Sequence, residues 1–202
     1  MNIVTLFEKL FKRRTQPSGV FVGRARTRDI AITYRMLAGF PGDVNRTHPA
    51  SIEPVLIDAT NPPTAYGQLV VVDATTEGVR PIGAGDSALT DGYGITVRPW
   101  PQQQAAATNY GAAPFGSVAP PASGIMDVLK QGYIMVVCNN AAANPPVKGQ
   151  PVYVWYAASS GNHVQGGFEA AATSGSTFEL PSDVTWQGGV DANNVAELVY
   201  HR

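Results

Sequence analysis

Hydrophobic residues near the start of the chain repeat with a helical period. At 100° per residue, the apolar side chains of residues 2–14 fall on one arc of about 160°, opposite Glu8, Lys9 and Lys12. They are Ile3, Val4, Leu6, Phe7, Leu10 and Phe11. Pro17 and Gly19 then provide stop signals. The pattern predicts an N-terminal amphipathic helix and linker over residues 1–19.

From residue 20 onward the apolar pattern changes to a period of two, which is typical of β-strands. Ile32, Tyr34 and Met36 alternate with polar residues, for example. Turns containing Gly, Pro, Asn or Asp separate the later strand-like runs. These runs cover residues 55–57, 68–72, 94–98, 132–138, 151–156 and 195–200. Many short strands with frequent turns predict an all-β barrel or sandwich over residues 20–202.

Two later segments do not follow this pattern. Residues 123–130 (Ser-Gly-Ile-Met-Asp-Val-Leu-Lys) are the one other helical candidate, and a short one. Residues 99–124 are long, uncharged and rich in Pro, Ala and Gln up to the last few positions. Loops longer than about 12–15 residues are usually functional or disordered, and the lack of charge argues against a solvated tail. We therefore expect an extended arm that contacts a neighbouring subunit.

Composition narrows the class of protein. The 202 residues are 44% apolar, enough for one substantial domain, but only 14% are charged. An average globular protein has about 25% charged residues. Low charge combined with 21 Gly and 16 Pro suits an all-β protein that has much of its surface covered by something else. The net charge of −1 provides no field that would attract nucleic acid.

No segment is apolar for 18 residues, so no membrane-spanning helix is expected. The N-terminal charges follow and interleave with the apolar residues, unlike those of a secretory signal. The expected compartment is therefore the cytoplasm, or a particle assembled there. The single cysteine, Cys138, excludes an intramolecular disulfide, and its apolar neighbours predict a buried, inert thiol.

Three fragments resemble catalytic or metal-binding motifs, but each lacks a required partner. Residues 83–88 have the spacing of a dinucleotide fingerprint, yet a turn follows instead of a helix. Gly85-Asp86-Ser87 resembles the nucleophile block of GDS-type esterases, but no Asp-x-x-His follows to supply a base. Residues 191–194 resemble the start of a calcium loop without its later Gly and Glu, so a hairpin turn explains them better. We expect no enzyme, no cofactor and no metal.

Two basic features allow more than one interpretation. Arg24, Arg26 and Arg28 share one face of an extended segment, but a nucleic-acid-binding stripe would add interleaved aromatic residues and more charge. The basic amphipathic helix is compatible with a membrane surface, although docking of its apolar face on protein is favoured. We therefore expect neither nucleic acid nor membrane as a partner.

Five sequence blocks then follow one another in a distinctive order. The first, residues 38–44, contains Gly-Phe-Pro-Gly. The others are residues 93–99, 123–136, 147–155 and 180–198. In this order they resemble the structural cement, or head decoration, proteins of tailed bacteriophages over about residues 38–202, whereas residues 1–37 depart from that family's pattern.

The resemblance implies a β-rich fold without catalytic residues, often in trimeric clusters, bound to the major capsid protein on the outer shell. The expected function is that of a virion structural protein on the capsid exterior, assembled in the host cytoplasm. It would bridge major capsid protein subunits and stabilise the shell as a homo-oligomer, with a trimer favoured. The alternative is a carbohydrate-binding or tail-associated adhesin module with Trp100, Trp155 and Trp186 as candidate aromatics, although Trp155 fits a core strand better.

Candidate contact residues come from the apolar arc of the helix and from the arm. The helix would dock on the capsid, on a neighbouring subunit or on its own domain. The residues expected at a capsid or subunit interface are Ile3, Leu6, Phe7, Leu10, Phe11, Trp100, Tyr110 and Phe115.

Deletion of residues 1–16 is expected to leave a folded β domain that binds capsids or itself more weakly. An isolated helix of this length is marginal in water, so its apolar arc gains stability only when a partner covers it. Replacing Phe7 and Leu10 by Asp should reproduce the effect, measured by sedimentation with capsids. A truncated chain that binds as well as the intact one, or that fails to fold, would contradict this role.

Overall fold

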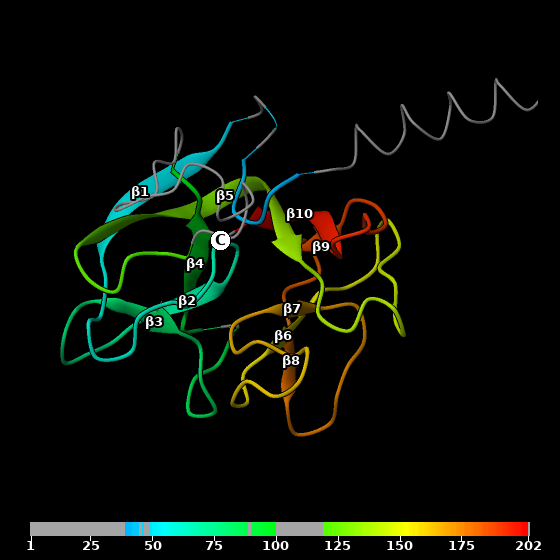
Figure 1. Ribbon diagram of the computed structural model, residues 1–202. Coiled ribbons are helices and arrows are strands. Elements are labelled where there is room, and N and C mark those ends of the chain that lie inside the picture. Colours follow the sequence, from blue (N-terminus) through cyan, green and yellow to red (C-terminus); the bar gives the residue numbers. More distant parts are fainter. Residues whose placement is uncertain (1–38, 45, 47–48, 89, 100–118, 202) are drawn as a thin grey trace, which may run out of the picture. The chain divides into compact units, whose positions relative to one another are not determined.

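The computed structural model describes residues 39–44, 46, 49–88, 90–99 and 119–201. The chain divides into two compact units, Met1–Met36 and Leu37–Arg202, and every described residue belongs to the second. The described residues form strands and turns without a helix (Figure 1). The all-β prediction is thus confirmed for this part of the chain. The narrower choice of a barrel or sandwich remains a prediction, and the predicted N-terminal helix lies outside the described residues.

In these ranges ten strands form two antiparallel sheets. The larger sheet has the order β3-β2-β4-β5-β10-β9, with β1 also paired to β5, and the smaller has the order β7-β6-β8. The strands are β1 (Ser51–Leu56), β2 (Leu69–Val72), β3 (Val79–Pro81), β4 (Gly92–Val97), β5 (Ile125–Val137), β6 (Tyr153–Trp155), β7 (Phe168–Glu169), β8 (Thr177–Glu179), β9 (Thr185–Trp186) and β10 (Val195–His201).

The long strand β5 connects the two halves of the larger sheet. Its first half pairs with β1 and β4, and its second half pairs with β10. Leu129 in the first half and Ile134 in the second both enter the main core, although their odd spacing would place them on opposite faces of a regular strand. Gly132, with a φ of 138°, lies between them, and the β1 register shifts nearby. This irregularity lets one strand serve both halves.

The first half of β5 buries apolar side chains on both of its faces. Met126 and Val128 pack in a small cluster with Ile57, Val70 and Val79. The alternate residue Leu129 points into the main core, which also receives Phe168 and Trp186. A parallel bridge between Ile57 and Val79 joins the end of β1 to β3. The path β3-β2-β4-β5-β1 therefore surrounds the small cluster.

The predicted short helix at residues 123–130 is wrong, because Ile125 begins strand β5. Ile125, Met126, Val128 and Leu129 have a spacing that a helix could use. In the structure, Met126 and Val128 fill one cluster while Leu129 fills the other. A strand that is buried on both faces shows no clean alternation of apolar and polar residues, which explains the error.

Two local predictions are confirmed by the structure. The Asp191 carboxylate accepts the N–H groups of Asn193 (2.8 Å) and Val195 (2.9 Å), and Asn194 has a φ of 59°. This is the turn predicted before the last strand, β10. Cys138 is fully buried, and burial raises the pKa of its thiol to about 12. The predicted burial of this cysteine is therefore correct.

Replacing Gly94 by Ala is expected to destabilise the fold by about 1–3 kcal/mol. The added Cβ would lie 2.6 Å from the carbonyl oxygen of Leu129, which belongs to the ladder between β4 and β5. The same change at Gly188, where nothing lies within 4 Å, is the matched control and should be nearly neutral. Urea unfolding followed by tryptophan fluorescence measures both variants, and equal midpoints would contradict the packing described here.

Candidate functional site

The contact residues predicted from the sequence all lie outside the described residues. They are Ile3, Leu6, Phe7, Leu10, Phe11, Trp100, Tyr110 and Phe115. Their contacts with a capsid or with a neighbouring subunit remain predictions. The described residues instead offer two polar clusters and one exposed apolar surface.

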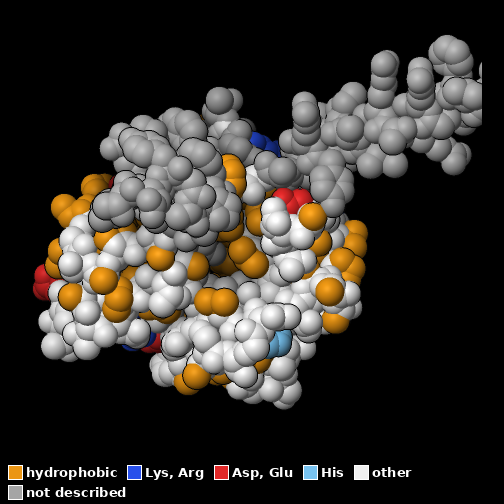
Figure 2. Space-filling model, in the orientation of Figure 1, with side chains coloured by type: hydrophobic (Ala, Val, Ile, Leu, Met, Phe, Trp, Pro, Cys, Tyr) orange, Lys and Arg blue, Asp and Glu red, His pale blue; other side chains and the backbone are white. Residues whose placement is uncertain are grey.

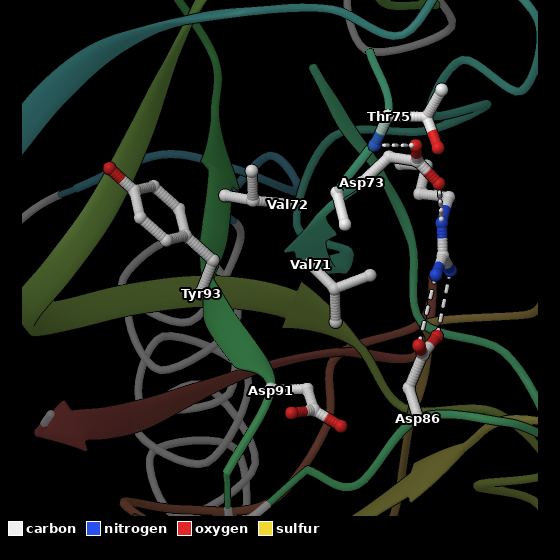
Figure 3. Close-up of a pocket in the computed structure, with 9 residues that line it drawn as sticks. Val71, Val72, Asp73, Thr75, Asp86, Asp91 and Tyr93 are labelled. Carbon is white, nitrogen blue, oxygen red and sulfur yellow. Dashed lines mark hydrogen bonds and ion pairs between the residues drawn. The ribbon is translucent and has the colours of Figure 1, made fainter. Parts of the chain in front are cut away.

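The first polar cluster is centred on Arg80 in β3, beside a hollow of about 520 Å³ (Figure 3). The guanidinium binds the Asp86 carboxylate through both terminal nitrogens, at 2.7 and 2.9 Å. Its Nε donates to Asp73 at 3.1 Å. Asp73 also accepts the N–H of Thr75, and Asp86 accepts the N–H of Gly83. One arginine thus ties together the turns that follow β2 and β3.

The electrostatics of this cluster favour fixed charges. The Arg80 guanidinium is the main cause that lowers the pKa of Asp86, and the Asp86 carboxylate in turn raises the pKa of Arg80. The backbone N–H groups of Thr75 and Thr76 lower the pKa of Asp73. Both acids are therefore ionised near neutral pH and share one cation. A cluster of this kind holds loops in place and does not provide a proton donor or acceptor.

Residues 83–88, which have the spacing of a dinucleotide fingerprint, form part of the same cluster. The N–H of Asp86 donates to the carbonyl oxygen of Gly83 at 3.1 Å, which closes a turn. The Asp86 side chain points back to Arg80 (Figure 3). The glycines of this segment therefore serve a turn that places Asp86 on Arg80.

The second polar cluster fixes the loop between β6 and β7. His163 is hydrogen-bonded through Nδ1 to the buried carboxylate of Glu169. Its ring stacks on Trp155, with centroids 4.1 Å apart and an interplanar angle of 18°. The Trp155 Nε1–H donates to the carbonyl oxygen of Ala158 at 3.2 Å. Trp155 is only 7% exposed and Trp186 is fully buried, so neither offers an open aromatic platform to a carbohydrate. The interpretation of Trp155 as a core residue is confirmed.

The exposed apolar surface lies on β1 and the start of β5. Ile52, Pro54 and Leu56 alternate along one face of β1, and Leu56 is directly opposite Ile125 in the β5 register. The exposed fractions of Ile52, Leu56 and Ile125 are 43%, 53% and 70%. Figure 2 shows hydrophobic side chains along the upper left margin, where Figure 1 places β1. We refer to Ile52, Pro54, Leu56 and Ile125 as the β1 patch.

Sequence reasoning missed the β1 patch, although a signal was present. In a strand, residues 52–57 divide into two alternating sets that point to opposite faces, and both sets are apolar apart from Glu53. Val55 and Ile57 account for one set, because they pack with the small core cluster. Ile52, Pro54 and Leu56 form the other set, which the described residues leave exposed.

Two other kinds of site are absent from the described residues. No helix there is long and apolar enough to cross a membrane. In the same ranges, no group of three or more His, Cys, Asp and Glu side chains is placed to hold a metal ion.

Comparisons with known proteins point to a bacteriophage capsid. Residues 30–200 match a family model described as XM1 gp53 minor capsid protein. The fold is similar to that of a chain in a solved structure described as "The capsid of Myoviridae Phage XM1". That similarity has a TM-score of 0.58 and 20% sequence identity, and it covers 80% of this chain and 89% of that chain. A search of curated proteins found no match.

Replacing Arg80 by Gln is expected to reduce the free energy of unfolding by about 1–2 kcal/mol at pH 7, since the pair is partly screened by solvent. Arg80 lowers the pKa of Asp86 below its usual value of 3.8, so this stabilisation is present above that pKa and is lost as the pH falls through the folded-state value. Urea unfolding at several pH values should therefore show the two proteins converging in acid.

The matched control is Asp183→Asn, because Asp183 is an exposed aspartate outside this cluster. It should leave the free energy of unfolding nearly unchanged at pH 7. An Arg80→Gln variant as stable as the parent at neutral pH would show that the cluster does not hold the two turns.

Proposed function

Because the chain belongs to the XM1 gp53 minor capsid protein family, we propose that it binds the outer surface of a phage capsid and bridges major capsid protein subunits. Family membership gives the coarser statement directly: the protein is a capsid-associated structural protein of a phage virion. The exterior position, the bridging and the stabilisation of the shell are the proposal. The resemblance to head decoration proteins over residues 38–202 supports it.

The single structural observation that carries the proposal is the β1 patch. A protein that attaches to a shell needs an accessible apolar surface that loses water on contact, and each buried Å² contributes about 25 cal/mol. Three side chains of the patch are 43–70% exposed while the strand beneath them is held by β5. The apolar surface is therefore presented on a formed sheet, which costs little further ordering when a partner binds.

We further propose that the protein is not catalytic and acts as a homo-oligomer, with a trimer favoured. Arg80 pairs with Asp73 and Asp86 beside the hollow of about 520 Å³, which supports a structural role for that cluster. Several linked copies on a repeating shell would bind more tightly than a single copy, because the second contact forms at a high effective concentration. A major capsid protein subunit could then leave the shell only after several of these contacts break.

The alternative of a carbohydrate-binding or adhesin module has less support. Such a module stacks sugar rings on accessible aromatic faces. Of its candidate aromatics, Trp155 and Trp186 are buried, and Trp100 lies outside the described residues. No observation favours this function over the first.

The proposed function is tested with shells of the major capsid protein assembled without this chain. The purified full-length protein is expected to sediment with the shells, to saturate, and to raise the temperature or denaturant concentration at which they break. Bovine serum albumin in the same assay is the control for trapping. If the protein stays in the supernatant, or binds without changing shell stability, the bridging function is refuted.

A further inference from the structure

A single carboxylate lies inside the β1 patch. Asp127 is two residues after Ile125 on β5, so its side chain lies on the same face. In the register it lies opposite Pro54 of β1 on one side and Val97 of β4 on the other. It is half-buried, and its side chain makes no hydrogen bond or ion pair with any described residue.

The neighbouring charged residues, Glu53 and Lys130, interact with Tyr93 on the opposite face of the sheet. The Tyr93 hydroxyl donates to Glu53 at 2.6 Å. Lys130 lies over the Tyr93 ring, 3.2 Å from its centroid. Glu53 and Lys130 alternate with patch residues along β1 and β5, and Tyr93 packs against the small core cluster on the opposite face. Asp127 is therefore left with apolar neighbours and with no cation among the described residues on its own face.

This arrangement restricts what can cover the patch. An apolar partner that buried Ile52, Leu56 and Ile125 would also remove water from Asp127. A carboxylate that loses its water without gaining a partner costs several kcal/mol, which would offset much of the apolar gain. A partner that brings a cation avoids this cost, and the dry surroundings strengthen the attraction.

We propose that the β1 patch, together with Asp127, binds a segment of the shell protein in which a Lys or Arg is flanked by apolar side chains. This inference rests on the proposed function and names the surface that carries it out. The flanking side chains would cover Ile52, Leu56 and Ile125, and the cation would meet Asp127. The apolar part supplies affinity, and the charge pair selects the partner and its register.

The backbone of β1 favours binding across the side-chain face. The N–H of Ile57 donates to the carbonyl oxygen of Gly124 at 2.8 Å, so Ile57 faces β5 with its polar groups. Backbone groups of successive residues in a strand point alternately toward and away from its neighbour, and the register is constant from Ile52 to Leu56. Pro54, three residues before Ile57, therefore directs its nitrogen away from β5. Proline has no N–H there, which interrupts the donors that an added strand would need. The partner thus binds on top of the strand and does not extend the sheet.

A second copy of this chain is a poorer occupant. A twofold contact centred on the patch would use the same residues on both copies, so Asp127 of one copy would approach Asp127 of the other. Two carboxylates in an apolar contact repel each other and lack a counter-ion. Charge complementarity therefore favours a basic partner over self-association at this surface.

The test compares full-length variants in sedimentation with shells assembled without this chain. Leu56→Ser and Ile125→Ser each remove an apolar contact and should weaken binding about fivefold to tenfold. Asp127→Asn should weaken it several-fold and reduce its dependence on salt, and Asp127→Lys should weaken it by at least about tenfold. Val147→Ser, at a residue 57% exposed, and Asp183→Lys are the matched apolar and charge controls, which should bind like the parent.

Each outcome decides between the inference and its alternatives. Circular dichroism and urea unfolding first confirm that each variant is folded as the parent is. If the parent binds and the patch variants bind equally well, the patch is not the contact surface and the proposed function stands. If the parent does not bind shells, the proposed function fails and the inference fails with it.

Two further outcomes would also overturn the inference. Tighter binding by Asp127→Lys would show that the covering segment is acidic. Light scattering would show whether Leu56→Ser and Ile125→Ser dissociate an oligomer. If they do, and shell binding per subunit is unchanged, the patch joins copies of this chain. The expected result is weaker shell binding with an unchanged oligomeric state.

Discussion

The larger sheet depends on β5, because among the described strands no other one connects its two halves. The first part of β5 is hydrogen-bonded between β1 and β4, and the last part pairs with β10. On the side away from β10, Gly42 and Asp43 bond to both backbone groups of Met135, at 2.7 and 2.9 Å. A regular strand could not place both Leu129 and Ile134 in the main core, because residues at an odd spacing point to opposite faces. The irregularity near Gly132 changes the face that points to the main core, and this lets one strand support both halves.

The position of β1 follows from this arrangement. It pairs with the first part of β5, and its end reaches β3 through the bridge between Ile57 and Val79. Val55 and Ile57 are used by the small cluster, so Ile52 and Leu56 necessarily face the other way. On that side the main core covers Leu129 and Val97 but stops short of Ile125. The exposed apolar patch is thus a geometric consequence of an edge strand that extends beyond the core.

The sequence predicted those features that depend on local chemistry. The turn at residues 191–194 follows from an Asp side chain that can accept nearby N–H groups, and Cys138 follows from its apolar neighbours. The start of β5 was misread because both of its faces are buried. The strands β3, β7, β8 and β9 contain only two or three residues each, too few to show a period. Asp127 was missed because its importance depends on pairing with Pro54 and Val97, which are far away in the sequence.

Asp127, a carboxylate without a partner among the described residues, suits an apolar surface that must stay uncovered until a basic partner binds it. The apolar residues alone would bind many surfaces, including other copies of the chain. Asp127 penalises any partner without a cation, and Pro54 interrupts the strand edge through which β proteins aggregate. Both features lower the maximum affinity of a single contact. For the proposed homo-oligomer on a repeating shell this loss is tolerable, because contacts made by linked subunits multiply. Selectivity can therefore come from the individual contact and strength from its repetition.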